Sequence, residues 1–291
     1  MRLHTAKKNF VLPSPREFLF TMSYCPITHT GSPPASLSPT VARPVRVVAR
    51  DLEADELLSA HQHDWGQVTY AIDGTVQVNA NHQTWFVPPQ RAIWIPAHVV
   101  HEVRTLERAK LRAIHIESSV VPIGGEECVV LEVSNLMREL VRALTHLELS
   151  QDYSNSGAHH AQREAHLAVC LLDELANAAP LPLNVPMPRD NRLRSLCEIL
   201  IADPASNLSL QDLSKQVGAS ERTLARLFQT EMQMSFGLWR QQMRLARAAP
   251  LIASGKPLSV VAAELGYASQ SAFSAMFKKT FGQSPSQFFK T

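Results

Sequence analysis

Hydrophobic and polar positions alternate with a period of two in the first half of the chain. Short segments rich in β-branched and aromatic residues occupy 45–49, 68–72, 75–78, 84–87, 92–95 and 111–116. Asp73 and Gly74 separate two of them, which is a hairpin signal. Several short strands at this spacing predict a β-sandwich or barrel over residues 45–130.

The period changes to that of a helix between residues 131 and 178. The helical spacing places Leu136, Leu140, Leu144 and Leu147 on one face, and Leu167, Leu171, Leu172 and Leu175 on another. We expect an antiparallel helical pair joined near 155–157. Leu136, Leu140 and Leu144 are candidates for a dimer interface, although the same leucines would also suit packing against the barrel. Residues 179–190 then hold four prolines and are expected to form a linker.

The last hundred residues repeat one helical plan. A short amphipathic helix over 208–217, with Ser209 as N-cap, precedes a turn at 218–220, and a second helix over 221–229 starts after Ser220. Helix, short turn with glycine and helix is the helix-turn-helix arrangement. The plan returns at 258–265, 266–269 and 270–279. Two such units about one helical turn of DNA apart suit successive major-groove segments.

The faces of the second helix of each unit predict which side chains read DNA. Leu224, Leu227 and Phe228 form the inward set of the first, and Phe273, Met276 and Phe277 that of the second. The opposite faces carry Arg222, Ala225, Arg226 and Gln229 in the first helix, and Gln270, Ser271, Ser274 and Ala275 in the second. Arginine can form two hydrogen bonds with guanine, and glutamine can form two with adenine. The alternative interpretation is that these polar side chains only form a solvent-exposed helix face. Phosphate contacts are expected of Lys215, Lys278 and Lys279.

Residues 240–250, which continue the helical pattern between the two units, contain Pro250. A proline inside a helix removes one backbone hydrogen bond and clashes with the preceding turn, at about 3 kcal/mol or a kink. The sequence therefore leaves the rigidity of the spacing between the units open.

Charge is divided unevenly along the chain. The 291 residues carry a formal net charge of +2, which taken alone argues against a nucleic-acid-binding protein. Residues 191–291 nevertheless have 12 Lys/Arg and 6 Asp/Glu, a net of +6, and residues 1–190 have a net of −4. The basic half coincides with the helix-turn-helix units.

The remaining composition predicts a cytoplasmic globular protein. No apolar run reaches the length of a membrane span, and the N-terminus lacks the pattern of a secretory signal. Cys25, Cys128, Cys170 and Cys197 are scattered, which predicts reduced, mostly buried thiols. Residues 1–44 hold seven of the 19 prolines and are expected to be a mobile arm, in which Met22 offers an alternative start to Met1.

Three stretches of the C-terminal half carry a family resemblance. They are Ser220-x3-Leu224-x-Arg226-x-Phe228, Ala263-Glu-Leu-Gly-Tyr267-x-Ser269-x3-Phe273-x3-Phe277-Lys, and Phe281-Gly-x-Ser-Pro285. Together they resemble the AraC/XylS transcription regulators over residues 190–291. The resemblance implies seven helices, with two helix-turn-helix units joined by a long linker helix, and it implies that Arg222, Ala225 and Arg226 face the groove. Many relatives have a longer polar side chain in the place of Ala275.

Histidines in the strand-rich half form a second pattern. His61-Gln-His63-x3-Gln67-x6-Gly74 and Pro96-x4-His101 are similar to the two short motifs of the cupin barrel, a double-stranded β-helix. In metal-binding cupins the matching positions hold two histidines, a glutamate and a third histidine, so Gln67 departs from the motif, as does His98 where glycine is usual. Two histidines two apart on a strand share a face.

The interpretations of this cluster are a divalent metal on His61, His63 and His101, a metal-free polar effector pocket, or ordinary core or surface histidines. His115 has weaker support as a further member, and His159 and His160 are expected in an exposed loop. The stretch 85–97 resembles one AraC-type subgroup with a cupin sensor. Trp65, Trp85 and Trp94 are pocket walls or core residues.

We therefore expect an α+β chain: an arm (1–44), a cupin-like sensor barrel (45–130), a helical pair (131–178), a linker (179–190) and an all-α DNA-binding domain (191–291). The expected function is sequence-specific binding of a double-stranded DNA operator, regulated by a small effector or metal, by a homodimer without catalytic residues. The alternative is a metal-dependent cupin enzyme with an appended helical domain.

Overall fold

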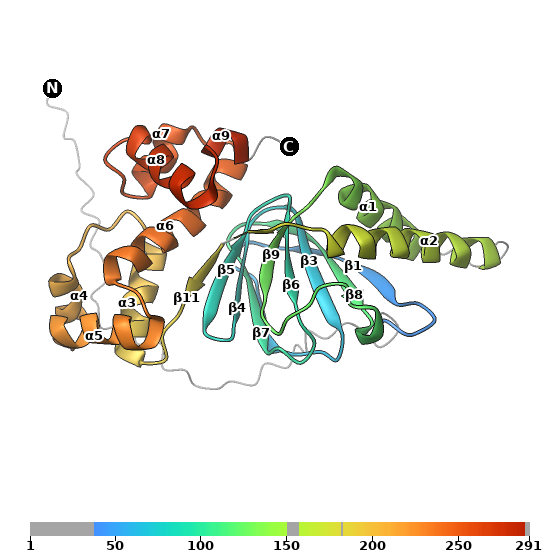
Figure 1. The fold of residues 1–291 in the computed structure, drawn as a ribbon, viewed down its shortest axis with the longest axis horizontal. Helices are drawn as coiled ribbons and strands as arrows, with labels where there is room; N and C mark the ends of the chain where they lie inside the picture. The colour runs from blue at the N-terminus through green and yellow to red at the C-terminus, as the bar shows by residue number, and fades with distance from the viewer. Residues whose placement is uncertain (1–37, 150–156, 182, 289–291) are drawn as a thin grey trace, which may run out of the picture. The chain divides into compact units, whose positions relative to one another are not determined.

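The computed structural model describes residues 38–149, 157–181 and 183–288. Within these residues, the strand-rich part consists of two antiparallel sheets (Figure 1). The six-stranded sheet has the order β1-β8-β3-β6-β9-β10, and the five-stranded sheet has the order β11-β5-β4-β7-β2. The strands are β1 (Val45–Leu52), β2 (Leu57–His61), β3 (Gly66–Asp73), β4 (Val76–Ala80), β5 (Gln83–Val87), β6 (Arg91–Ile95), β7 (His101–Thr105), β8 (Ala109–Ile116), β9 (Val129–Glu132), β10 (Pro180–Leu181) and β11 (Asn184–Pro186), with a 3₁₀ turn at Ser118–Val120.

Alternation along the strands separates two cores. In β3 and β6, Ala71, Ile93 and Ile95 face the interior between the sheets, where they join residues of β4, β5 and β7. Val68, Tyr70, Ala92 and Trp94 lie on the other face of the six-stranded sheet. Because successive strand side chains point to opposite faces, this sheet is buried on both sides. The predicted barrel-like β-domain is confirmed.

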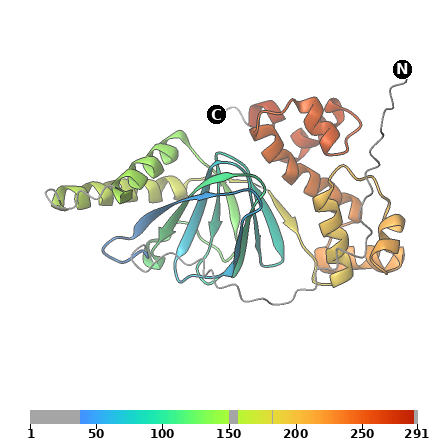
Figure 2. The same cartoon turned by 180° about the vertical axis from the view of Figure 1, so that it is seen from behind.

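The outer face of the six-stranded sheet is covered by helices α1 (Asn135–Leu149) and α2 (Gly157–Ala176) (Figures 1 and 2). Leu140 and Leu144 are buried in this core together with Met137 and Val141, whereas Leu136 remains 55% exposed. The assignment of Leu140 and Leu144 to a dimer interface is therefore wrong, and the alternative of packing on the barrel holds. The buried face of α1 is therefore rotated by about one residue from the face that the leucine spacing predicted.

The segment predicted as a linker contributes two strands. β10 pairs with β9, and β11 pairs with β5, so each lies at an edge of its sheet. Proline has no N–H to donate and is tolerated in strands mainly at such edges. Pro180 and Pro186 occupy these edge strands, which explains why a proline-rich segment forms part of the sheets.

The described C-terminal residues form seven helices, as the resemblance implied: α3 (Asn191–Ala202), α4 (Leu210–Gln216), α5 (Glu221–Met232), α6 (Phe236–Ala253), α7 (Leu258–Glu264), α8 (Gln270–Phe281) and α9 (Pro285–Phe288). Trp239 and Met243 of α6 join the core around α3–α5, and its Leu245 and Ala248 join the core around α7–α9. Helix α6 is thus shared by two small cores.

Several local expectations need correction. His159 and His160 lie in the first turns of α2, not in a loop, and His160 is half-buried. Cys170 is exposed on α2, whereas Cys128 and Cys197 are buried as expected. The predicted arm falls mostly outside the described residues, and so do Met22 and Cys25; at its end Arg43 forms ion pairs with Glu164 of α2, at 2.6 Å, and Glu148 of α1, at 3.3 Å.

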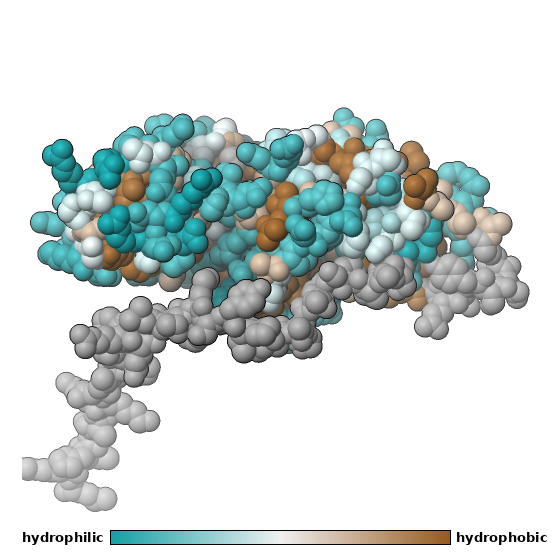
Figure 3. All heavy atoms as spheres, turned by 90° about the horizontal axis from the view of Figure 1, so that it is seen from below, coloured by the Kyte–Doolittle hydropathy of each residue, from teal (hydrophilic) through white to brown (hydrophobic). Residues whose placement is uncertain are grey.

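Within the described residues, no helix combines the length and the apolar character needed to cross a membrane. The face drawn in Figure 3 is largely hydrophilic, and its hydrophobic residues form separate patches.

Candidate DNA-reading surface and barrel pocket

Side-chain caps define both helices of the first helix-turn-helix unit. The Ser209 hydroxyl accepts from the Asp212 backbone N–H at 3.1 Å while the Asp212 carboxylate accepts from the Ser209 N–H, which is a capping box. Gly218 turns the chain with φ +65°, and the Ser220 hydroxyl then accepts from the Thr223 N–H at 3.1 Å. Both predicted N-caps are confirmed, and they fix where α5 begins.

Helix α5 separates a buried face from an exposed one. Leu224, Leu227 and Phe228 are buried in the core, as predicted. Arg222, Ala225, Arg226 and Gln229 are exposed on the other side of the helix. In the described part of the chain, neither Arg222 nor Arg226 forms an ion pair, so both guanidinium groups are available to a ligand.

The second unit repeats this geometry with a weaker polar face. Gly266 turns the chain with φ +70°, and the Ser269 hydroxyl accepts from the Ala272 N–H at 3.1 Å to start α8. Phe273 and Phe277 are buried, and Met276, predicted inward, is half-buried. The outward set comprises exposed Gln270, Ser271 and Ala275 and half-buried Ser274.

The three lysines proposed for phosphate contacts are exposed. Lys278 and Lys279 lie in the last turn of α8, and Lys215 lies in the last turn of α4. The Lys215 ammonium is 3.9 Å from the Asp212 carboxylate, and both groups are exposed.

Arg244 of α6 is a structural residue that the sequence did not single out. Its guanidinium donates to the carbonyls of Pro204 and Ser206, at 2.9 Å each, and to that of Gly266 at 3.2 Å. The first two carbonyls precede α4, and the third lies in the turn between α7 and α8. One buried cation therefore links both helix-turn-helix units. An arginine among the apolar positions of a helix was the available signal.

Pro250 does not end α6, which continues to Ala253. Pro250 is buried and lies in the last turn of the helix, so the hydrogen bond lost with its missing N–H and the clash of its ring with the preceding turn fall near the helix end. The expected interruption of the connecting helix is therefore confined to its end.

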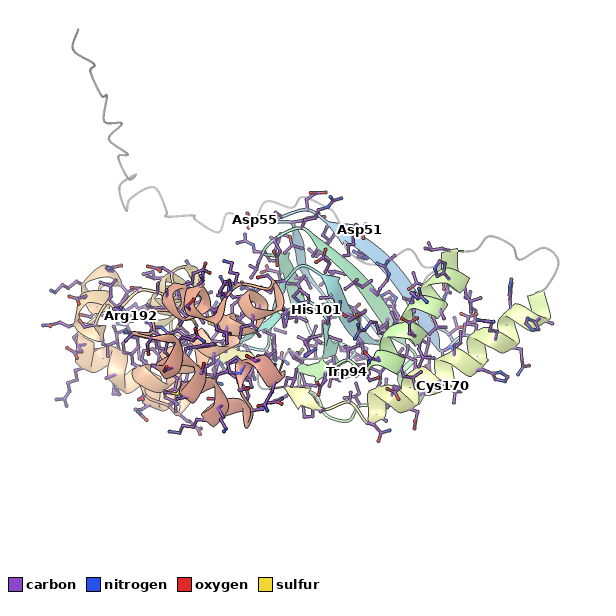
Figure 4. All side chains as sticks on the ribbon, turned by 90° about the horizontal axis from the view of Figure 1, so that it is seen from above. Asp51, Asp55, Trp94, His101, Cys170 and Arg192 are labelled. Atoms are coloured by element: carbon purple, nitrogen blue, oxygen red, sulfur yellow. The ribbon has the colours of Figure 1, made fainter. Side chains whose placement is uncertain are left out.

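The barrel brings His61, His63 and His101 together (Figure 4 labels His101). His61 of β2 is paired in register with His101 of β7, and their ring centroids are 4.3 Å apart. The ring of His63 lies 5.1 Å from that of His101 and 6.3 Å from that of His61.

Each of these three imidazoles is oriented by a backbone carbonyl. The Nδ1 atom of His61 lies 2.8 Å from the carbonyl oxygen of Ser59. The Nδ1 atom of His63 lies 2.6 Å from the carbonyl oxygen of Trp65, and that of His101 lies 2.9 Å from the carbonyl oxygen of Val99. A carbonyl only accepts, so Nδ1 carries the proton and Nε2 keeps a free lone pair. The Nε2 atoms of His63 and His101 are buried without a partner among the described residues.

Burial keeps the imidazoles of His63 and His101 neutral. It lowers the pKa of both residues to about 4, partly opposed by the hydrogen bonds to the carbonyls of Trp65 and Val99. Two uncharged rings whose centroids are 5.1 Å apart thus hold buried acceptor nitrogens.

Gln67 and three further polar residues line a small cavity together with His61 of the cluster. The Gln67 amide donates to the Thr69 hydroxyl at 3.0 Å, and both residues line the cavity with His61, His115 and Arg50. The volume of this cavity is about 20 Å³, which is room for one or two water molecules. Sequence reasoning supported His115 only weakly and missed Arg50 and Thr69. The shared face of Arg50 and inward Leu52 on β1 was the available signal.

The donor set does not match a metal centre. No group of three or more His, Cys, Asp or Glu side chains that could hold a metal ion occurs within the described ranges. His98, in the place of the usual glycine, keeps a positive φ of 62° and lies outside the cluster, 3.4 Å from the exposed carboxylate of Asp64.

The tryptophans divide between wall and core. The indole of Trp65 stacks on the His63 ring with centroids 5.2 Å apart and an interplanar angle of 7°. Trp85 and Trp94 are buried in the two cores of the β-domain. Of these three tryptophans, Trp65 is therefore the one suited to contact a ligand of the histidine cluster.

Comparison with known proteins matches both halves of the chain. A helix-turn-helix domain model matches residues 213–291, and an AraC-like ligand binding domain model matches residues 45–176. The HTH-type transcriptional regulator NimR of Escherichia coli K12 is 35% identical over 235 residues, covering 80% of this chain and 83% of NimR. The arabinose operon regulatory protein of the same organism is 31% identical over 140 residues, covering 46% of this chain and 47% of that protein. Among solved structures, the C-terminal domain of AraT from Geobacillus stearothermophilus is 29% identical, covering 34% of this chain and 84% of that one with a TM-score of 0.32.

Proposed function

Because this chain belongs to the AraC family of transcriptional regulators, we propose that α5 and α8 read the bases of a DNA operator. The observation that carries the proposal is the repeated arrangement of a capped helix with a buried apolar face and an exposed polar face. A rigidly seated helix with a free polar face is what major-groove reading requires.

The first unit reads with its arginines. Arg222 and Arg226 are one helical turn apart on the exposed face of α5, with Ala225 and Gln229 beside them. A guanidinium donates two parallel hydrogen bonds to guanine O6 and N7, and a methyl such as that of Ala225 suits a thymine. We assign base-specific contacts to Arg222 and Arg226 first.

The second unit reads with shorter side chains. Gln270 is long enough for a two-bond contact to adenine, and Ser271 and Ser274 reach a base or a phosphate. Lys215, Lys278 and Lys279 contact phosphates, which position the protein without specifying sequence. We therefore expect the first unit to contribute more specificity than the second.

The barrel pocket binds a small polar effector without a metal. His61, Gln67, Thr69 and Arg50 offer polar groups to a cavity of about 20 Å³. The bare Nε2 acceptors of His63 and His101 belong to rings whose centroids lie 6.3 and 4.3 Å from that of His61. An effector larger than a few atoms must widen this cavity, and such a rearrangement supplies the differential binding that regulation requires. We assign no catalytic role to the histidines. A stoichiometric metal in the purified protein would contradict this assignment.

The regulator acts as a homodimer through the outer faces of α1 and α2. Leu136 and Val169 are 55% and 67% exposed there, and an open groove between the two helices is lined by Leu136, Leu147, Leu167 and polar neighbours. Exposed apolar side chains that line a groove between helices favour a protein partner. Of the interface expected from Leu136, Leu140 and Leu144, this surface keeps exposed Leu136, whereas Leu140 and Leu144 are buried.

Substitution of Arg226 tests DNA reading directly. We expect Arg226→Ala to weaken binding to the operator by about 1–3 kcal/mol and to relax specificity at one base pair. Fluorescence anisotropy with operator and shuffled duplexes measures both effects. Lys278→Ala should weaken binding to both duplexes alike, and Arg104→Ala, at an exposed position of β7, should change neither. Equal loss on operator and shuffled DNA by Arg226→Ala would overturn the assignment.

A further inference from the structure

A second cavity lies outside the barrel, between the outer face of the six-stranded sheet and α1. Its volume is about 290 Å³, at the low end of ligand pockets. The sheet side contributes Tyr70, Ile72, Gln90 and Arg112, and α1 contributes Arg138, Glu139, Val141, Arg142, Thr145, His146 and Leu149. We refer to these residues as the α1 cleft. Among the described residues, the α1 cleft and the histidine pocket have no member in common.

The α1 cleft carries more positive than negative charge. Its described residues include three arginines and one glutamate, Glu139. The Glu139 carboxylate is 2.8 Å from the Arg142 guanidinium. Arg112 donates to the carbonyl of neighbouring Leu111, and Arg138 donates to the Asn135 side chain, at 2.7 Å each. Within the described residues, neither Arg112 nor Arg138 forms an ion pair with a carboxylate.

Arg138 in particular has unused hydrogen-bonding capacity. Its Nε is buried and has no acceptor among the described residues. A buried donor without an acceptor costs about 1–3 kcal/mol, and more when the group is charged. An anion that accepts from Arg138 would remove this cost.

Tyr70 places a neutral polar group beside these cations. Its hydroxyl donates to the Gln90 side-chain oxygen at 2.8 Å, which fixes the hydroxyl at the wall of the cleft. Burial raises the pKa of Tyr70, and the charges of Arg138, Arg91 and Arg112 oppose that increase. The positive charges therefore act on the same point of the cleft.

The rest of the wall is apolar, formed by Ile72 on the sheet and Val141 and Leu149 on α1. We propose that the α1 cleft binds a small molecule with one carboxylate on a compact apolar body. The carboxylate pairs with Arg112 and Arg138, and the body covers the apolar wall. Because the two arginines come from the sheet and from α1, the bound anion holds this helix to the β-domain.

Binding of cyclohexanecarboxylate to the full chain, measured by isothermal titration calorimetry, tests the proposal. Cyclohexylmethanol serves as the neutral probe of the same shape. We expect the carboxylate to bind at least tenfold more tightly than the alcohol, because only an anion pairs with the guanidiniums. Arg138→Gln and Arg112→Gln should each weaken the carboxylate at least tenfold, and Arg138→Lys should retain part of the affinity.

Two control variants distinguish the α1 cleft from the remaining surface and from the barrel pocket. Arg104→Gln, at an exposed position of β7 in the other sheet, should leave binding unchanged. Arg50→Gln should also leave carboxylate binding unchanged. If the Arg50→Gln variant lost carboxylate binding, the carboxylate would be placed in the barrel pocket and the proposal would be overturned. Equal binding of acid and alcohol, or no binding of the acid up to about 10 mM, would overturn it as well. Thermal unfolding of each variant without ligand verifies that it is folded.

Discussion

At the scale of single residues, the histidine cluster shows how burial sets chemical state. The motif spacing predicted that His61, His63 and His101 meet, and they do. The spacing did not indicate the protonation state, because that depends on the carbonyls of Ser59, Trp65 and Val99 and on how deeply each ring is buried. These properties arise from the folded chain and not from the motif.

The lowered pKa values predict a loss of stability in acid. His63 and His101 have a pKa of about 4 in the folded protein and about 6.5 when unfolded, so the unfolded chain binds more protons between these values. Their contribution to stability is complete above pH 6.5 and is lost as the pH falls toward 4. Each histidine should lower the free energy of unfolding by about 2 kcal/mol between pH 7 and pH 5.

Urea unfolding at a series of pH values measures this loss. His63→Gln should reduce the slope of stability against pH in this range, whereas His159→Gln, on the exposed side of α2, should not. A chelator should leave the wild-type curve unchanged, since we propose that no metal is bound. A slope that is the same with and without His63, or a curve that shifts with chelator, would contradict a neutral, metal-free cluster.

At the scale of elements, local signals predicted the helices better than the strands. Ser209 and Ser220 cap α4 and α5 where the sequence placed them, because a cap depends on residues three positions apart. β2, β7 and β9 were missing from the predicted strands, and β10 and β11 were taken for part of a linker, since their pairing partners lie far away in the chain. Edge pairing of short proline-containing strands has no local signature.

Arg244 is the element-scale device that holds the two helix-turn-helix units to α6. We expect Arg244→Ala to lower the free energy of unfolding by about 3 kcal/mol, because it leaves carbonyls of Pro204, Ser206 and Gly266 without their donor. Chemical denaturation measures the change. Arg226→Ala, at an exposed position, should change stability by less than about 0.5 kcal/mol.

Gly266 is constrained by the same contact. A Cβ at this position would lie 2.6 Å from the Arg244 guanidinium and 2.7 Å from the Ala205 carbonyl oxygen, and its φ is +70°. If Arg244→Ala proved as stable as the wild type, the guanidinium would not be the link between the units.

At the scale of the whole molecule, the uneven charge along the sequence follows the division of the chain into a β-domain with its helical pair and the helix-turn-helix units. The basic C-terminal residues form the helix-turn-helix units, and the acidic N-terminal residues form the β-domain and its helical pair. The order of these parts was evident from the change of hydrophobic period. The α1 cleft was not, because Arg112 and Arg138 come from different elements that only packing brings together.

Sequence reading by both helix-turn-helix units is the central claim. Selection of bound duplexes from a random pool by the full chain tests it most directly. We predict that the half-site bound by one protomer holds two enriched blocks whose centres lie about 10–10.5 base pairs apart, with Arg226→Ala removing preference in one block and Gln270→Ala in the other. Selection of no preferred sequence, or of a single block that neither substitution alters, would contradict it.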